Sequence, residues 1–281
     1  DFLLCLGARF DDRVAAVPAK FARKAKRIAH MDVDASEINK VKRVQWSHVG
    51  LLRPALEKLR LQGKVADFKR DWSPWHAHIA ELKRRHAMNY DRDSELIQPY
   101  YVIEEINRLT RGEAVIATGV GQHQMWAAQH YFYKRPRQLI SSGGLGTMGF
   151  ELPGAIGAQV ACPDAETWAI CGDGGFQMTL QEMAVLVDEG LPVKIAIFNN
   201  GYLGMVRQWQ QLFYDKNLVS VAMTQPDFVK LADAYGIRGI RVETKAEVAS
   251  AIREARAHKG PILLDFQIDQ EENVWPMVPA G

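Results

Sequence analysis

The chain has 281 residues, 47% of them hydrophobic, and a formal net charge of +2. This composition indicates a globular protein and excludes a disordered one, and the length is sufficient for two hydrophobic cores at about 100–200 residues per domain. No apolar run approaches the roughly 20 residues of a membrane span, and no basic-then-apolar signal stands at the amino terminus. We therefore expect a soluble protein without a membrane partner.

The charge is unevenly distributed, with a net +7 over residues 1–98 and −5 over residues 99–281. The basic runs at residues 23–27 and 83–85 are interpreted as solvated faces of helices, because they have acidic neighbours and no interleaved aromatic side chains. This pattern argues against nucleic acid as a partner. Three scattered cysteines, Cys5, Cys162 and Cys171, are interpreted as buried packing residues in a reducing compartment.

Residues 1–64 alternate strand-like runs at 2–6, 27–33 and 44–49 with helical patterns, which predicts the carboxyl-terminal part of a parallel α/β domain. The chain begins with Asp1 directly on a strand-like run, and this suggests that an upstream part is missing. Residues 65–98 carry no strand signal. There Trp72 and Trp75 precede a helix expected from about residue 76 to 87, so we interpret this stretch as a connector and packing helix.

From Pro99 a second α/β unit is expected, in which strands alternate with helical patterns. The apolar residues at helical spacing in 227–235 and 245–258 are expected to cover the sheet. The sequence therefore predicts an α/β fold with a doubly wound, six-stranded parallel sheet, preceded by the end of another α/β domain. The six strands are expected near residues 113–118, 138–142, 167–171, 192–198, 238–242 and 261–268.

Polar residues follow two of these strands. Asp173 comes between glycines after the run 167–171, and Asn200 closes the run 193–198. The 24 residues between Gly174 and Asn199 are enough for one helix and a returning strand, which would bring Asp173 and Asn200 to the carboxyl ends of neighbouring parallel strands. Oxygen ligands suit Mg²⁺, and glycines let backbone N–H groups approach phosphate. This pattern predicts a site for a magnesium-bound diphosphate.

Residues 119–123 follow the first strand of the second unit and open a helix. Their backbone N–H groups and the side chains of Gln122 and His123 would lie where a diphosphate anion binds. The alternative for His123 is a solvated surface histidine. Its position at a strand end favours the diphosphate.

The segment from Asp173 through Asn200 resembles the thiamine diphosphate motif in pattern and spacing. Residues 121–126, 143–150 and 201–210 resemble the acetohydroxyacid (acetolactate) synthase large-subunit family, in the same order. The resemblance covers essentially the whole chain, and residues 272–279 are similar to the family's carboxyl-terminal arm. It implies the end of a central FAD-associated domain at residues 1–64, a connector at 65–98 and a thiamine diphosphate-binding fold at 99–281.

The resemblance also implies roles for individual residues. Mg²⁺ would be held by the side chains of Asp173 and Asn200 and the carbonyl of Tyr202. Met178 would wedge between the cofactor rings and Trp209 would line the substrate funnel, although packing is the usual role of a Met and core burial is the alternative for Trp209. The residues implied to contact thiamine diphosphate are Val120, Gly121, Gln122, His123, Gly146, Met148, Asp173, Gly174, Gly175, Asn200, Tyr202, Leu203, Gly204 and Met205.

Near the amino terminus, a charged loop follows the first strand, and the alternative to a functional role is a solvated turn. Family resemblance implies that Arg13 recruits the carboxylate of the second substrate, for which a guanidinium is suited. Asp34 is also expected to cap the start of a helix, with Glu37 three residues on as the second residue of a capping box. Two departures from the family pattern are Glu151, where Gly is common, and Leu51, where Asp is usual. The residues implied to border FAD are Gly7, Arg9, Phe10, Asp11, Asp32 and Val33.

The implied reaction is decarboxylation of pyruvate and transfer of the hydroxyethyl group to pyruvate or 2-oxobutanoate, in branched-chain amino acid biosynthesis. FAD would undergo no net redox change. The family's catalytic glutamate comes from the amino-terminal domain of a partner subunit, and Glu151 and Glu182 are not expected to replace it. A homodimer or homotetramer is implied, while a small regulatory subunit and the location, cytoplasmic in a bacterium or organellar in a eukaryote, stay open.

Two other functions are consistent with the sequence. One is a different thiamine diphosphate enzyme, such as a pyruvate oxidase or glyoxylate carboligase, against which residues 122–126 and 205–209 argue. The other is a cofactor-binding module without turnover in isolation. A product assay of the chain alone distinguishes an enzyme from such a module.

Overall fold

The computed structural model describes residues 2–66 and 70–277. Within these ranges the chain forms two compact units, one that runs to Ala87 and includes Pro276 and Met277, and one from Met88 to Trp275. No helix in the described ranges has the length and apolar content needed to cross a membrane. Residues 67–69 of the predicted connector, and Val278 and Pro279 of the predicted terminal arm, lie outside the described residues.

The first unit is a three-stranded parallel sheet of β1 (Phe2–Leu6), β2 (Arg27–Asp32) and β3 (Trp46–Val49), in that order. All three strands were predicted from the sequence. A small core of Cys5, Phe10, Ala15 and Ile28 packs beside the sheet. The helical elements of this unit are α1 (Asp12–Ala15), the 3₁₀ turn η1 (Ala35–Glu37), α2 (Leu52–Val65) and α3 (Ser73–Arg85).

Two local predictions in this unit are wrong. The basic run 23–27 does not form a helix: positive φ angles at Ala16 and Ala22 break the chain into separate turns, and Arg27 already belongs to β2. Trp75 lies inside α3 and not before it, because Pro74 is accommodated in the first helical turn. The second basic run, residues 83–85, does lie on α3, as predicted.

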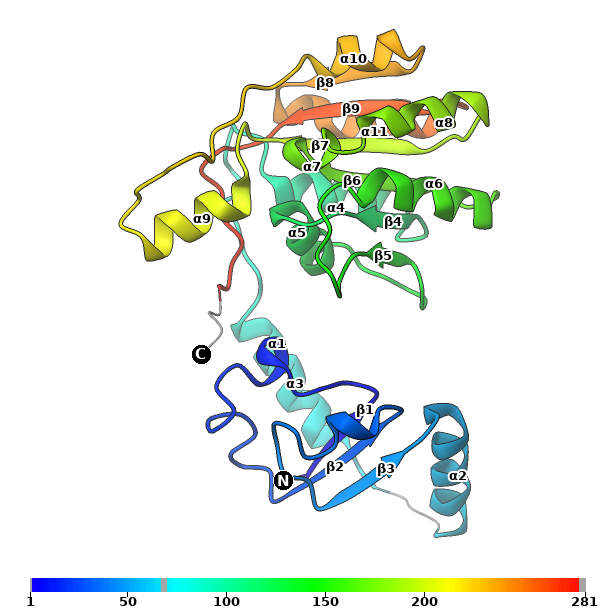
Figure 1. Cartoon of the computed structure of the whole chain (residues 1–281), viewed down its shortest axis with the longest axis vertical. Coiled ribbons are helices and arrows are strands. Elements are labelled where there is room, and N and C mark those ends of the chain that lie inside the picture. Colours follow the sequence, from blue (N-terminus) through cyan, green and yellow to red (C-terminus); the bar gives the residue numbers. More distant parts are fainter. Residues whose placement is uncertain (1, 67–69, 278–281) are drawn as a thin grey trace. The chain divides into compact units, whose positions relative to one another are not determined.

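The second unit is the predicted six-stranded, fully parallel sheet, in the order β5-β4-β6-β7-β9-β8 (Figure 1). All six strands lie where the sequence placed them. They are β4 (Val115–Thr118), β5 (Leu139–Ser141), β6 (Thr167–Gly172), β7 (Lys194–Asn199), β8 (Arg238–Val242) and β9 (Ile262–Gln267).

Helices cover both faces of this sheet. One face packs against α4 (Pro99–Leu109), α5 (Gln122–His130) and α11 (Lys245–Ala257), with Ile106, Trp126 and Ile252 fully buried. The other packs against α6 (Glu151–Ala161), α7 (Asp173–Phe176), α8 (Met183–Asp188) and α10 (Phe228–Ala234). Most of the apolar positions predicted to cover the sheet, among them Phe228 and Val248, are buried in these two layers, and Leu231 is partly buried. Successive strand residues point to opposite faces, which is why both cores share the strands.

The cysteine prediction holds for two of three residues. Cys5 and Cys171 are buried, whereas Cys162 is exposed. Cys162 follows the last residue of α6 as its C-cap, so it has left the apolar face of that helix.

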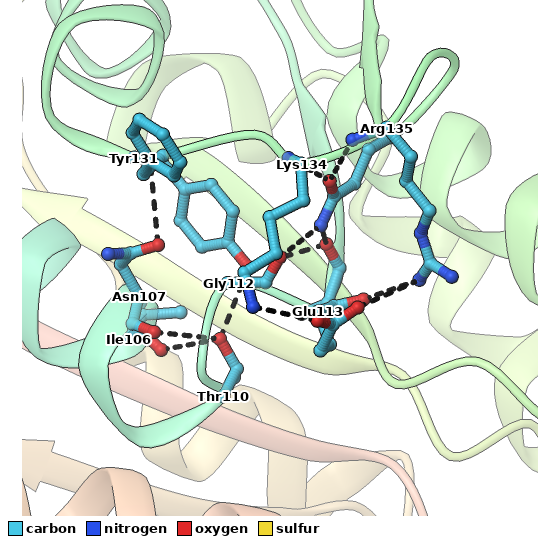
Figure 2. Close-up of polar contacts among 11 residues, drawn as sticks. Ile106, Asn107, Thr110, Gly112, Glu113, Tyr131, Lys134 and Arg135 are labelled. Atoms are coloured by element: carbon cyan, nitrogen blue, oxygen red, sulfur yellow. Dashed lines mark hydrogen bonds and ion pairs between the residues drawn. The ribbon is translucent and has the colours of Figure 1, made fainter.

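Hydrogen bonds fix where β4 and β5 start, at the amino-terminal ends of these two strands (Figure 2). The buried amide of Gln138 donates to the carbonyls of Gly112 and Ala114, at 2.6 and 2.8 Å, and accepts from the N–H of Lys134. Thr110 Oγ1 donates to Ile106 O at the end of α4. These contacts set where β4 begins, and therefore where residues 119–123 emerge at its other end.

Candidate cofactor-binding site

The candidate site is a cavity of about 220 Å³ at the carboxyl ends of β4, β6 and β7. The strand order reverses between β4 and β6, since β5 lies on one side of β4 and β6 on the other. Open α/β sheets bind ligands at such a point. The predicted residues that line this cavity are Val120, Gly121, Gln122, His123, Met148, Asp173, Gly174, Gly175, Asn200, Tyr202, Leu203, Gly204 and Met205.

The buried carboxylate of Asp173 links the ends of β6 and β7. Its Oδ2 accepts hydrogen bonds from the N–H of Gly201 at 2.8 Å, from the N–H of Asn200 at 3.2 Å and from Gln225 Nε2 at 2.9 Å. Burial raises the pKa of Asp173 to about 6. A divalent cation at this place would favour the ionised carboxylate.

Asn200 lies in the cavity wall with both ends of its amide bonded. Oδ1 accepts from the N–H of Tyr202 at 3.1 Å, and Nδ2 donates to Gln122 Oε1 at 3.3 Å. Within the described residues no group of three or more His, Cys, Asp and Glu side chains could hold a metal ion. A metal here would therefore draw on the Asp173 carboxylate and on amide and main-chain oxygens, a ligand set that suits Mg²⁺ better than a softer metal.

His123 is buried beside the end of β6. A Cβ atom on Gly172 would lie 2.8 Å from its Nδ1, so only glycine fits there. Its Nε2 is buried and has no hydrogen-bond partner among the described residues, and burial lowers the pKa of His123 to about 4. The alternative of a solvated surface histidine is wrong. A neutral imidazole with one unpartnered nitrogen in the wall of the cavity fits a polar ligand group.

Glu151, the first residue of α6, is completely buried between the two glycine-bearing turns. A Cβ atom on Gly119 would lie 1.6 Å from Glu151 Oε2, and one on Gly175 would lie 2.3 Å from Oε1. Neither oxygen has a hydrogen-bond partner among the described residues, and burial raises the pKa of this carboxyl to about 7. The two bare glycines thus make room for this side chain beneath the cavity.

Three of the predicted residues do not line the cavity. Gly146 lies in the loop before α6, and the Met178 side chain is 53% exposed. Trp209 lies on α9 (Gly204–Phe213), one turn after Met205, with its ring 5.1 Å from that of Phe213. Because Trp209 is 39% exposed, the alternative of core burial is wrong.

The predicted FAD residues all lie in the first unit. Phe10 belongs to its core, where its ring packs against Phe21 and His30. Asp11 accepts hydrogen bonds from the N–H groups of Arg13 and Val14 at the start of α1. Gly7 follows β1 with a positive φ angle, and the side chains of Arg9 and Val33 are exposed.

Arg13 and the residues at the end of β2 are the other predicted residues in the first unit. The Arg13 side chain is exposed and lies 3.7 Å from Asp12. Asp32 is buried and accepts from the N–H of Asp34, which in turn caps η1 as predicted. Glu37 does not close the predicted capping box, because it pairs with Lys40 at 2.7 Å.

Sequence reasoning missed several residues of the site. Phe198 and Val206 also line the cavity, and Gln225 and Gln208 bond to predicted residues. Gln225 donates to Asp173 from the loop before α10, and nothing in the sequence pattern points to it. Gln208 lies in the block 201–210 that carries the family resemblance, but a glutamine at helical spacing does not by itself indicate a buried position. It is fully buried and bonds to Gln122.

Comparisons with known proteins agree with this geometry. Residues 119–266 match the model of the carboxyl-terminal, cofactor-binding domain of thiamine pyrophosphate enzymes, and residues 1–59 match the model of the central domain. Thiamine pyrophosphate is another name for thiamine diphosphate.

Similar curated proteins include acetolactate synthase 1, chloroplastic, of Oryza sativa subsp. japonica, at 45% identity, and the acetolactate synthase of Mycobacterium leprae, at 43%. The acetolactate synthase large subunit of Corynebacterium glutamicum is 44% identical. Each alignment covers 100% of this chain but only 45–46% of the relative, so the chain spans somewhat less than half the length of these proteins. With its parallel sheet, the cavity at the strand ends and the match over most of the second unit, the chain belongs to the thiamine pyrophosphate enzyme family.

Proposed function

We propose that this chain is the carboxyl-terminal part of an acetolactate synthase. The proposed reaction is decarboxylation of pyruvate and transfer of the hydroxyethyl group to pyruvate or 2-oxobutanoate, in branched-chain amino acid biosynthesis. The observation that carries the proposal is the buried Asp173 carboxylate, bonded to the N–H groups that follow β7, in the wall of the cavity at the switch point of the sheet. The similarity to acetolactate synthases over the whole chain supports it.

The residues of this cavity have distinct proposed roles toward Mg²⁺ and thiamine diphosphate. Asp173, Asn200 and the carbonyl of Tyr202 would hold the metal, and the bare backbone of Gly174 and Gly175 would approach the diphosphate. When bound, thiamine diphosphate supplies the carbon that adds to the 2-oxo acid and the ring that accepts its electrons. Met205 in the cavity wall and Met178, whose N–H bonds to the carbonyl of the cavity residue Gly175, would exclude water from the cofactor rings without placing a charge there.

The other parts of the proposal extend beyond the cavity. We assign residues 1–64 to an FAD-associated domain, 65–98 to a connector and 99–281 to the cofactor domain. FAD, bound without net redox change, would be bordered by the loops after β1 and β2. The protein would act as a homodimer or homotetramer in the bacterial cytoplasm or a eukaryotic organelle.

Calorimetry of Asp173→Ala in the full-length protein tests the site. The substitution removes the carboxylate that would bind the metal and also the acceptor of four hydrogen bonds, so we expect no measurable binding of thiamine diphosphate in the presence of Mg²⁺. Asp233→Ala, at an exposed position of α10, is the matched control and should bind as the wild type does. Unchanged affinity in Asp173→Ala would refute the site assignment.

A further inference from the structure

Gln208 ties the carboxyl-terminal segment 272–275 to α9. Its side chain is fully buried, its Nε2 donates to Val274 O at 2.9 Å, and its Oε1 accepts from the N–H of Val274 at 2.9 Å. The amide thus pairs with the main chain of Val274 as a neighbouring strand would. Because both partners are buried, loss of either bond leaves an unsatisfied polar group.

The same Gln208 oxygen also accepts a hydrogen bond from Gln122, at the start of α5. Gln122 Nε2 donates to Gln208 Oε1 at 3.0 Å and to Glu272 O at 3.2 Å. A side-chain amide nitrogen carries only two hydrogens, so neither is left for a phosphate. Gln122 lines the cavity, but its nitrogen is committed to the carboxyl-terminal segment.

The oxygen of Gln122 completes a chain of amides that ends at Asn200. Gln122 Oε1 accepts from Asn200 Nδ2 at 3.3 Å, which leaves Asn200 Oδ1 on the opposite side of that amide. The path depends on Gly204, where a Cβ atom would lie 2.0 Å from Gln122 Oε1 and 2.9 Å from Asn200 Nδ2. A side chain at position 204 would displace Gln122 from Asn200.

We propose that Gln208 and Gln122 are positioning residues that couple segment 272–275 to the metal-binding oxygen of Asn200. This inference rests on the proposed function, because it takes Asn200 as a ligand of Mg²⁺. When the segment is seated, Gln208 and Gln122 hold the Asn200 amide in one orientation, with its oxygen available to the metal. By linkage, binding of the metal and cofactor stabilises the seated segment to the same degree.

Because Arg207 also holds segment 272–275, coupling of the segment to Asn200 can be distinguished from simple attachment of the segment to α9. The buried guanidinium of Arg207 donates from Nη2 to Glu272 O at 3.2 Å and to Asn273 Oδ1 at 3.1 Å, and among the described residues it has no hydrogen bond to the side chain of Gln122 or Gln208. The segment therefore keeps these bonds when Gln208 is replaced. A change in Mg²⁺ affinity would then be due to loss of the amide chain from Gln208 through Gln122 to Asn200.

The test is Gln208→Met in the full-length protein, with Gln210→Met as the matched control. Gln210 lies on the same helix and pairs with the main chain of Val219 through both ends of its amide, but has no bond to Gln122. With saturating thiamine diphosphate, calorimetry should show Mg²⁺ bound about tenfold or more weakly in Gln208→Met, as is typical for loss of a group that orients a metal ligand. Gln210→Met should retain wild-type affinity.

Hydrogen exchange at the Val274 amide gives a second measurement that a merely structural role would not move. In the wild type, Mg²⁺ with thiamine diphosphate should slow this exchange. In Gln122→Met the Val274 amide keeps its Gln208 acceptor but the path to Asn200 is broken, so the slowing should disappear. If the wild-type exchange is the same with and without Mg²⁺ and cofactor, the coupling is refuted, even where Gln208→Met does not fold.

The outcomes also separate this inference from the proposed function. Wild-type Mg²⁺ affinity in a folded Gln208→Met variant would overturn the coupling alone. A wild-type protein that binds neither Mg²⁺ nor thiamine diphosphate would overturn both.

Discussion

The side chain of Glu151 is completely buried, and neither of its carboxyl oxygens has a hydrogen-bond partner in the part of the chain that the structure describes. The sequence showed that it departs from a family pattern in which Gly is common, but not where the carboxyl would lie. In the structure it fills the space left by Gly119 and Gly175. Burying a carboxylate without a partner is costly, so the neutral acid is favoured and the pKa rises to about 7.

This raised pKa makes the stability of the protein depend on pH. Below the ordinary pKa of 4.5 the carboxyl is neutral in both the folded and the unfolded chain, and its contribution to stability is fully present. As pH rises through 4.5 to about 7, the unfolded chain ionises first, so the free energy of unfolding falls. The total loss is about 3 kcal/mol, from a pKa difference of roughly 2.5 units.

Glu151→Gln should remove this dependence, because the amide does not titrate. Urea unfolding at pH 5 and pH 8 should show the variant gaining stability relative to the wild type at the higher pH. Glu189→Gln, at an exposed position after α8, is the control and should show no such relative gain. An equal difference between Glu151→Gln and the wild type at both pH values would contradict the buried, neutral carboxyl.

At the scale of the element, α9 carries residues of different environments on one short helix. Its first residues line the cavity, Arg207 and Gln208 are buried beneath the carboxyl-terminal segment, and Trp209 is partly exposed. The i, i+4 spacing places Met205 and Trp209 on one face of this helix. That spacing could not show that Gln208 bonds to Val274, because the two residues are 66 positions apart in the chain.

Trp209→Leu in the full-length protein should lower the preference for 2-oxobutanoate over pyruvate and leave pyruvate decarboxylation largely intact. A pocket that distinguishes substrates by one methylene is worth roughly 1–3 kcal/mol, so the effect should be a change in product ratio. Competition between the two acceptors measures it. Phe213→Leu, which changes the ring beside Trp209, shows whether the effect belongs to Trp209 itself. An unaltered product ratio in Trp209→Leu would mean that Trp209 does not line the predicted substrate funnel.

At the scale of the whole molecule, the alternation of strands and helices was predictable, since each strand is a short apolar run between helical patterns. The meeting of Asp173 with Asn200 was also predictable, because β6 and β7 are neighbours in both sequence and sheet. What the sequence could not show was which residues far apart in the chain would bond to each other, or where the backbone would turn. Gln225 reaches Asp173 from a loop, and the turns at residues 17–24 replace an expected helix because two alanines adopt positive φ angles.

The chain by itself should make no acetolactate at a useful rate, although the proposed metal and diphosphate ligands are all within one unit. Among the described residues that line the cavity, Asp173 is the only carboxylate, and it is expected to bind the metal. The general acid–base help of a further carboxylate typically contributes about 10² to 10⁴ in rate. The assay combines the purified chain with Mg²⁺, thiamine diphosphate, FAD and pyruvate. Turnover within about tenfold of a full-length homologue would contradict this prediction.

The place of β9 in the sheet has a consequence for biosynthesis of the protein. Among the described strands β9 comes last in the sequence, yet it lies between β7 and β8, and β8 pairs with β9 alone. A growing polypeptide on the ribosome therefore completes β8 before β9, its neighbour in the described sheet, exists. Until residues 262–267 have left the exit tunnel, β7 and β8 both carry unpaired backbone groups, which are a template for association between nascent chains. A ribosome that stalls before this point would leave its product prone to aggregation.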